Sequence, residues 1–163
     1  MANPTISLNQ FELGHMIGEI DLSFSASESV FSVLFDPTAG AATLEFGEGV
    51  KLIDLGASDQ AGPPIVGLRT TDLIPTFGVR VHSTKQASVP AGYLTEIATK
   101  GAVVYMASAG ALARGVKVSL DQANSGFIQA MGTKSEFGIT LDKIAANGLG
   151  RVWITADGFT SGT

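Results

Sequence analysis

The fold class is decided by the stretch Gly115-Val116-Lys117-Val118-Ser119-Leu120. After the opening glycine, apolar and polar side chains alternate along it. Side chains on a β-strand point alternately to its two faces, so this alternation predicts a strand with one apolar face. Glycine readily takes the positive φ angles of tight turns. The stretch therefore predicts a turn that leads into a half-buried strand.

The same combination of turn and strand recurs along the chain. Pro90-Ala91-Gly92 leads into Tyr93–Ile97, and Asn147-Gly148-Leu149-Gly150 leads into Arg151–Thr155. Together with the first stretch they form a weak internal echo, which predicts successive strands of one barrel. Alternation alone predicts further strands at Ile20–Phe24, Val79–His82 and Leu94–Ala98.

Glycine is abundant and evenly spread, at 20 of 163 residues. Short alternating runs separated by glycine turns are typical of all-β sandwiches and barrels. We therefore expect an all-β fold, a small β-barrel or sandwich with glycine-rich turns and at most one or two short helices.

One pair of runs predicts a hairpin. Phe46-Gly47-Glu48-Gly49 separates Ala42–Glu45 from Val50–Leu55. The two glycines can supply the positive φ angles of the connecting turn, so we expect the two runs to pair with each other.

Two segments could instead be helical. Val30–Phe35 follows a possible capping box at Ser25–Glu28, but its β-branched and aromatic side chains favour a strand. Leu141–Gly148 predicts a single helical turn, with Asn147 and Gly148 as its C-terminal stop.

The length of 163 residues favours one domain. We expect a single β domain over residues 15–163. The first 14 residues, Met1–Gly14, carry one charged side chain, Glu12, and Pro4 withholds a backbone donor. They form either an N-terminal docking arm or an ordinary first strand of the barrel.

Composition narrows the classes of partner. Lys and Arg number 10 and Asp and Glu number 15, which gives a net charge of −5. General nucleic-acid and acidic-membrane binders are usually basic, so we expect neither partner. No segment approaches the ~20 apolar residues of a membrane span, and the N-terminus lacks the basic and apolar regions of a signal peptide.

Charged residues make up only 15% of the chain, and cysteine is absent. The low charge is explained either by a surface of small neutral residues or by a surface that is buried against other chains. The absence of cysteine excludes thiol catalysis, disulfides and zinc–thiolate sites.

A search for catalytic motifs returns none. His15 and His82 belong to no ligand-spaced cluster, and we interpret both as surface residues, His82 on the solvent side of a strand. Gly132-Thr133-Lys134-Ser135 departs from the phosphate-binding loop, because a threonine separates the glycine from the lysine. Trp153 is expected in the core. We therefore predict no catalytic, cofactor-binding or metal-ligating residue, no cofactor and no enzymatic activity.

Six segments of the C-terminal half form a recognisable series: Phe77–Val81, Val89–Ala98, Gly101–Ala107, Ala113–Val118, Gly138–Asp142 and Gly148–Ile154. Through these segments the chain resembles the capsid decoration (cement) proteins of tailed bacteriophages. The resemblance covers roughly residues 76–155. Tyr93 departs from the family pattern, which often has an acid there, and Thr140 replaces a small apolar residue.

The resemblance implies a small β-barrel protein on the outer surface of the virion capsid, often as a trimer. Its partners would be the major capsid protein and further copies of itself, and it would bridge major-capsid subunits. Two other classes remain open: a tail or baseplate module of a phage, and, more distantly, a small carbohydrate-binding module or hydrolase.

Overall fold

The computed structural model describes residues 14–54 and 62–158, and these are built of strands and turns without a helix. The fold is all-β, as the alternating runs predict. The strands are β1 (Val30–Phe35), β2 (Thr43–Leu44), β3 (Gly49–Asp54), β4 (Ile65–Leu68), β5 (Gly78–Arg80), β6 (Val89–Pro90), β7 (Leu94–Ala98), β8 (Val103–Ser108), β9 (Lys117–Leu120), β10 (Phe127–Ala130), β11 (Gly138–Thr140) and β12 (Gly148–Ile154).

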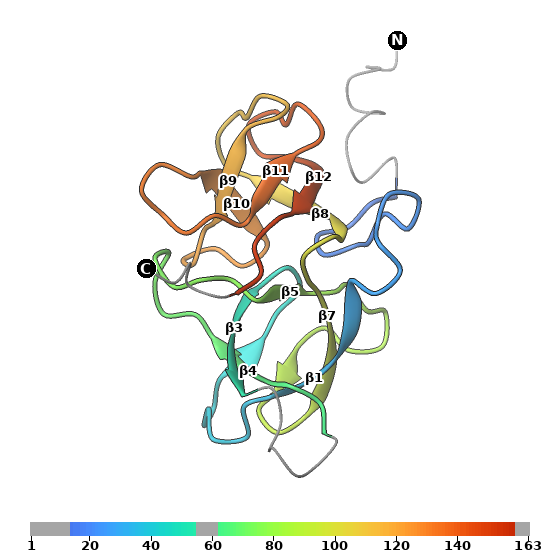
Figure 1. The fold of residues 1–163 in the computed structure, drawn as a ribbon, viewed down its shortest axis with the longest axis vertical. Coiled ribbons are helices and arrows are strands. Elements are labelled where there is room, and N and C mark those ends of the chain that lie inside the picture. The colour runs from blue at the N-terminus through green and yellow to red at the C-terminus, as the bar shows by residue number, and fades with distance from the viewer. Residues whose placement is uncertain (1–13, 55–61, 159–163) are drawn as a thin grey trace.

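Ten of these strands close into two five-stranded barrels, which are stacked along the long axis of the molecule (Figure 1). The first barrel has the order β1-β4-β3-β5-β7, and the second has the order β10-β8-β12-β11-β9. The remaining strands, β2 and β6, pair only with each other. Closed barrels leave no unpaired strand edge, which protects a chain this rich in strands from edge-to-edge association.

The two barrels have the same topology. In the first, β1 pairs in parallel with β4 and antiparallel with β7. In the second, β8 pairs in parallel with β10 and antiparallel with β12. The antiparallel pairs β3–β4, β3–β5 and β5–β7 correspond in turn to β9–β10, β9–β11 and β11–β12. The chain therefore contains one barrel design twice, with β2 and β6 as additions to the first copy.

The correspondence extends to single residues. Gly78 lies opposite Val50, and Gly138 lies opposite Val118. The residue before each glycine is phenylalanine, and its backbone N–H donates to the carbonyl of the same valine at 2.8 Å in both barrels. Because both barrels have the same register and the same phenylalanine-to-valine hydrogen bond, we infer that they are structural repeats.

The left-handed backbone positions also repeat. Gly47 and Gly115 have φ angles of 68° and 78°, and each lies three residues before the valine just described. Gly92 and Asn147, with φ angles of 86° and 57°, precede the last strand of each barrel. Asparagine tolerates this region better than most residues, so it can replace glycine at the second site.

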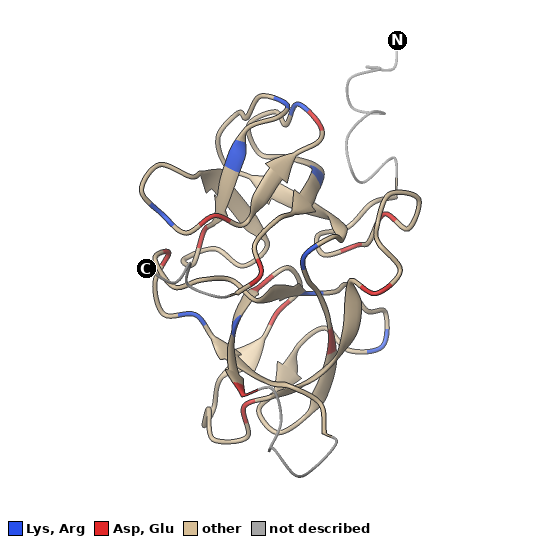
Figure 2. Ribbon diagram, in the orientation of Figure 1, with Lys and Arg blue, Asp and Glu red and all other residues tan. Residues whose placement is uncertain are grey.

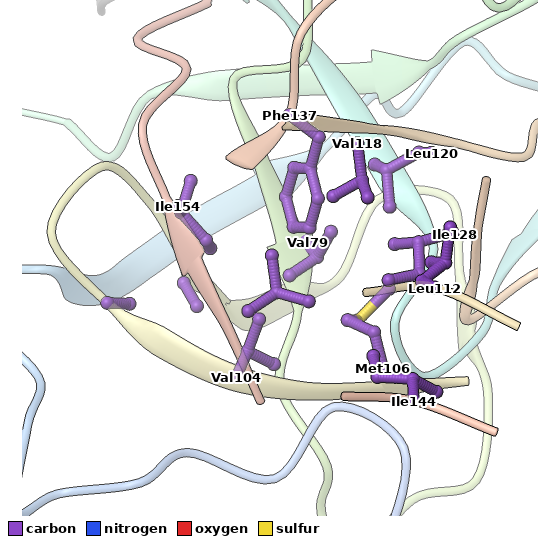
Figure 3. Packing of buried hydrophobic residues seen from close by; sticks show 13 residues of the cluster. Val79, Val104, Met106, Leu112, Val118, Leu120, Ile128, Phe137, Ile144 and Ile154 are labelled. Carbon is purple, nitrogen blue, oxygen red and sulfur yellow. The ribbon is translucent and has the colours of Figure 1, made fainter. Parts of the chain in front are cut away.

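Each barrel has its own apolar interior. That of the first barrel contains Val33, Phe35, Leu44, Val50, Val66, Phe77, Val89 and Ile97. That of the second contains Ala102, Val104, Met106, Leu112, Val118, Leu120, Ile128, Phe137, Ile144, Val152 and Ile154. Val79 and Ala98 belong to strands of the first barrel but to the apolar cluster of the second, and Figure 3 shows Val79 beside Phe137 and Val118. The barrels are therefore joined by an apolar contact at Val79 and Ala98.

Charge is sparse on the strands, especially those of the second barrel (Figure 2). Lys117 and Arg151 are the charged residues of its five strands. The described ranges contain no helix that could span a membrane.

The internal echo was correctly assigned to strands but not to one barrel. Tyr93–Ile97 falls on β7 of the first barrel, whereas the other two runs fall on β9 and β12 of the second. The two barrels share one pattern of turns, so similarity in sequence arises between them as well as within them.

The predicted hairpin at Phe46–Gly49 is wrong. β2 pairs with β6, and β3 pairs with β4 and β5, so the two runs lie in different sheets. Gly47 has the expected positive φ angle, but its N–H donates to the carbonyl of Arg80. The guanidinium of Arg80 in turn bonds the carbonyl of Leu44 at 3.0 Å, which holds β2 against β5.

Two further expectations are corrected, and one is confirmed. Ile20–Phe24 is a bridge at Ile20 followed by a turn, not a strand. Leu141–Gly148 contains no helical turn, because Ile144 bridges to Leu112 and the chain turns at Asn147. Val30–Phe35 is a strand, as its β-branched and aromatic side chains indicate.

The predicted N-terminal arm, residues 1–14, lies outside the described residues except for Gly14, which is exposed with a φ angle of 76°. The single β domain over residues 15–163 stays a prediction.

Candidate interaction surface

The chain between residue 14 and β1 lies along β8. The N–H of Gly18 donates to the carbonyl of Tyr105 at 2.9 Å, and the N–H of Tyr105 donates to the carbonyl of Glu19 at 2.9 Å. Farther along, the N–H of Asp21 donates to the carbonyl of Val103 at 2.9 Å. These bonds bring side chains of the N-terminal segment onto the outer face of β8 and β12.

Arg151 on β12 is the centre of this face. Its Nη2 and Nε donate to the two carboxylate oxygens of Asp142 at 2.8 and 3.0 Å. Its Nη1 donates to Oδ2 of Asp21 at 3.3 Å. The bond from Arg151 holds the pKa of Asp142 below its usual range, and the same bond raises the pKa of Arg151. The guanidinium is thus held in a fixed plane by two carboxylates.

Two large apolar side chains lie beside this guanidinium. The ring of Phe24 covers it at 5.2 Å, and Phe24 remains 63% exposed. Leu22 is 83% exposed on the same turn. The turn itself is closed by the N–H of Ser23, which donates to Oδ1 of Asp21 at 3.1 Å. Asp21 therefore orients both the turn and the guanidinium.

Tyr105, opposite Arg151 in the register of β8 and β12, adds a second aromatic pair. The ring of His15 stacks on it at 4.1 Å, and Nδ1 of His15 lies 3.0 Å from a carboxylate oxygen of Glu19. Burial, and then the nearby carboxylate of Asp21, raise the pKa of Tyr105. We call the set of His15, Leu22, Phe24, Tyr105 and Arg151 the Arg151 surface.

Trp153 lies two residues beyond Arg151 on β12 and is 45% exposed. The expectation that it lies in the core is therefore wrong. β12 alternates as predicted, but its inward residues are Val152 and Ile154, both fully buried. Alternation alone does not tell which of two apolar faces is turned inward.

The structure brings the two histidines together. His15 and His82 line one cavity of about 340 Å³, with Met16, Ile17, Glu45, Phe46 and Ser125. His82 follows β5 rather than lying in it, and its ring packs on that of Phe46 at 4.5 Å. The prediction of a solvent-side strand residue is therefore wrong for His82, whose Nδ1 is buried.

The exposed side chains of this surface are mainly apolar and aromatic, around one paired guanidinium. Within residues 14–54 and 62–158, no three His, Asp or Glu side chains converge as metal ligands would. Phe, Tyr and Arg are residue types that are enriched at protein interfaces, and here all three belong to one surface with the exposed Leu22. Sequence analysis missed Leu22 and Phe24, because their alternation predicted a strand. The Asp-x-Ser spacing before Phe24 was the available signal for a turn.

The comparisons with known proteins find a distant similarity in structure and none in sequence. No protein-family model and no curated protein sequence matches this chain. Among the solved structures that match, the head fiber gp8.5 N base of bacteriophage phi29 aligns with a TM-score of 0.47 and 12% identity. The alignment covers 77% of this chain and 92% of that chain. A similarity of this size establishes no shared function.

Proposed function

We propose that this protein is a non-catalytic structural component of a tailed-phage virion, which attaches to the outer surface of the capsid and bridges major-capsid subunits. Its partners are the major capsid protein and further copies of itself, most simply as a homotrimer. Neither nucleic acid nor a membrane is part of this proposal.

The observation that best supports the proposal is the position in the fold of the segments that resemble decoration proteins. Its segments Gly101–Ala107 and Gly148–Ile154 form β8 and β12, the antiparallel pair that presents Tyr105 and Arg151 outward. The resemblance thus covers the two strands that carry Tyr105 and Arg151, whereas His15, Leu22 and Phe24 lie in the N-terminal segment outside it.

The properties of the Arg151 surface support docking on a large protein partner. Phe24 and Leu22 are exposed to water, whereas monomeric proteins rarely cluster such side chains without a binding role. Their polar neighbour Arg151 is already paired and oriented, so little side-chain entropy is lost on binding. Many copies on a regular lattice would add avidity to each weak contact.

Attachment can be measured by co-sedimentation with capsids of the phage that lack the protein. We expect the wild-type protein to sediment with them, and the double substitution L22S/F24S to weaken binding by about ten-fold or more, as loss of an interface hot spot does. L73S is the matched control, because Leu73 is 67% exposed and lies in the loop between β4 and β5.

The alternative roles give different results. Binding to isolated tails or baseplates but not to capsids would indicate a tail component. Saturable binding to an oligosaccharide, lost on substitution of an exposed aromatic residue, would indicate a carbohydrate-binding module.

A further inference from the structure

The contact between the two barrels uses one particular face of the first. Val79 on β5 and Ala98 on β7 are register partners, so their side chains lie on the same face. Ile97, the neighbour of Ala98, points into the first barrel, so Val79 and Ala98 point outward. Both are 0% exposed, because this outer face packs on the second barrel beside Phe137.

The repeat places a counterpart of this face on the second barrel. β11 and β12 correspond to β5 and β7, and Ile139 and Trp153 are register partners as Val79 and Ala98 are. The counterpart of Gly49, which lies opposite Val79, is Lys117, which lies opposite Ile139. We call Lys117, Ile139 and Trp153 the outer β9–β11–β12 face.

This counterpart face has no neighbour within the described chain. Trp153 is 45% exposed and Ile139 is partly exposed, where the corresponding residues of the first barrel are fully buried. At its edge, Nζ of Lys117 donates to Glu136 at 2.9 Å. An apolar centre with a polar rim is the usual anatomy of a protein interface.

We propose that the outer β9–β11–β12 face docks a second copy of this chain, head to tail. The first barrel shows that this face of the design can bury itself against another barrel of the same design. In the first barrel the face meets a barrel end, at Phe137, and not another copy of itself. The docking is therefore heterologous, and repetition of it closes a ring when the rotation allows.

A second copy explains the face better than an unrelated partner does. The second copy carries barrels of the same design as the one that packs on Val79 and Ala98 inside the molecule. A second copy also explains why the two corresponding residues differ in size. Ala98, which is buried between the barrels of one chain, is small, whereas the exposed Trp153 is large. Large aromatic residues supply most of the binding energy where two separate chains must associate.

The inference deepens the self-association in the proposed function, and it is tested without capsids. Sedimentation equilibrium of the purified full chain is expected to show association that strengthens with concentration. I139K/W153K is expected to weaken this association by about ten-fold or more, as loss of a buried aromatic anchor does. L94S is the matched control, because Leu94 is 59% exposed on β7.

Two results would overturn the inference. One is a wild-type protein that stays monomeric up to about 1 mM, a concentration at which even weak specific contacts are populated. The other is an I139K/W153K variant that is folded, as shown by an unchanged thermal transition, and associates like the wild type. If that variant is unfolded, W153S replaces it, since serine at this exposed site removes the ring without adding charge.

This test is separate from the test of attachment. A protein that is monomeric yet binds capsids contradicts only the docking of a second copy. A protein that associates as expected but does not bind capsids contradicts only the proposed function.

Discussion

At the scale of single residues, the sequence does not reveal which polar side chains lie inside. The alternation of Val79–His82 predicts a strand that turns Arg80 to its polar side. It is 1% exposed, and it donates to the carbonyls of Leu44, Ala87 and Gln86 rather than to a carboxylate. Both faces of β5 are buried, one inside the first barrel and one against the second. An alternating sequence predicts one buried and one exposed face, so it cannot predict a strand that is buried on both.

Arg151 and Asp142 give the prediction at this scale. The folded pKa of Asp142 lies below its usual value, because Arg151 bonds the carboxylate. Its stabilising effect is therefore complete above the unfolded pKa of about 3.9 and is lost as pH falls through the lower, folded value. D142N should cost about 1 kcal/mol at neutral pH, a modest value because the pair is partly exposed.

Urea unfolding at a series of pH values measures this effect. Below pH 4 the difference between D142N and the wild type should shrink. A difference that does not shrink as pH falls through the lowered, folded pKa of Asp142 would show that the carboxylate charge contributes nothing.

At the scale of elements, strand existence was predictable and strand pairing was not. The runs at β7, β9 and β12 follow from alternation and from the glycine turns before them, and β1 follows from its β-branched and aromatic side chains. The false hairpin at Phe46–Gly49 shows the limit, because a glycine turn permits a hairpin but does not require one. Pairing there is decided by Arg80, a contact over 36 residues of sequence.

Gly78 gives the prediction at this scale. A Cβ added at Gly78 would lie 2.5 Å from the carbonyl oxygen of Ala98 on the neighbouring strand, so the two strands would have to separate. G78A should therefore destabilise the protein by about 1–3 kcal/mol, as overpacking does. G110A is the control, because a Cβ at Gly110 meets nothing within 4 Å and should change stability by less than about 0.5 kcal/mol.

Chemical denaturation of G78A and G110A measures the free energy of unfolding of each variant and so tests this prediction. Equal stabilities for G78A and G110A would mean that the barrel accommodates the added methyl group by a small shift.

At the scale of the whole molecule, the repeated barrel was beyond sequence analysis. The repeats share turn positions and a phenylalanine–glycine pair at residues 77–78 and 137–138, but few identical core residues. Any apolar residue of suitable size fills a barrel interior, so packing preserves the topology without preserving the sequence. The Arg151 surface was equally hidden, since it joins residues from a turn with residues from β8 and β12 that are far apart in the chain.

The apolar contact between the barrels gives the prediction at this scale. Val79 lies in the first barrel and packs in the cluster of the second, so the barrels should unfold together as one cooperative unit. V79A, which removes two buried methyl groups, should lower the stability by about 2 kcal/mol and leave a single transition. Scanning calorimetry tests this. Two separate transitions in the wild type would show that the barrels are independent domains.

The central claim is attachment to the outside of a capsid, and cryo-electron microscopy of capsids saturated with the protein tests it most directly. The account predicts density for both barrels at regular positions on the outer surface, each copy touching more than one major-capsid subunit. In that density, residues of the Arg151 surface lie against the capsid. Bare capsids at saturating protein, or density confined to the tail, would contradict the claim.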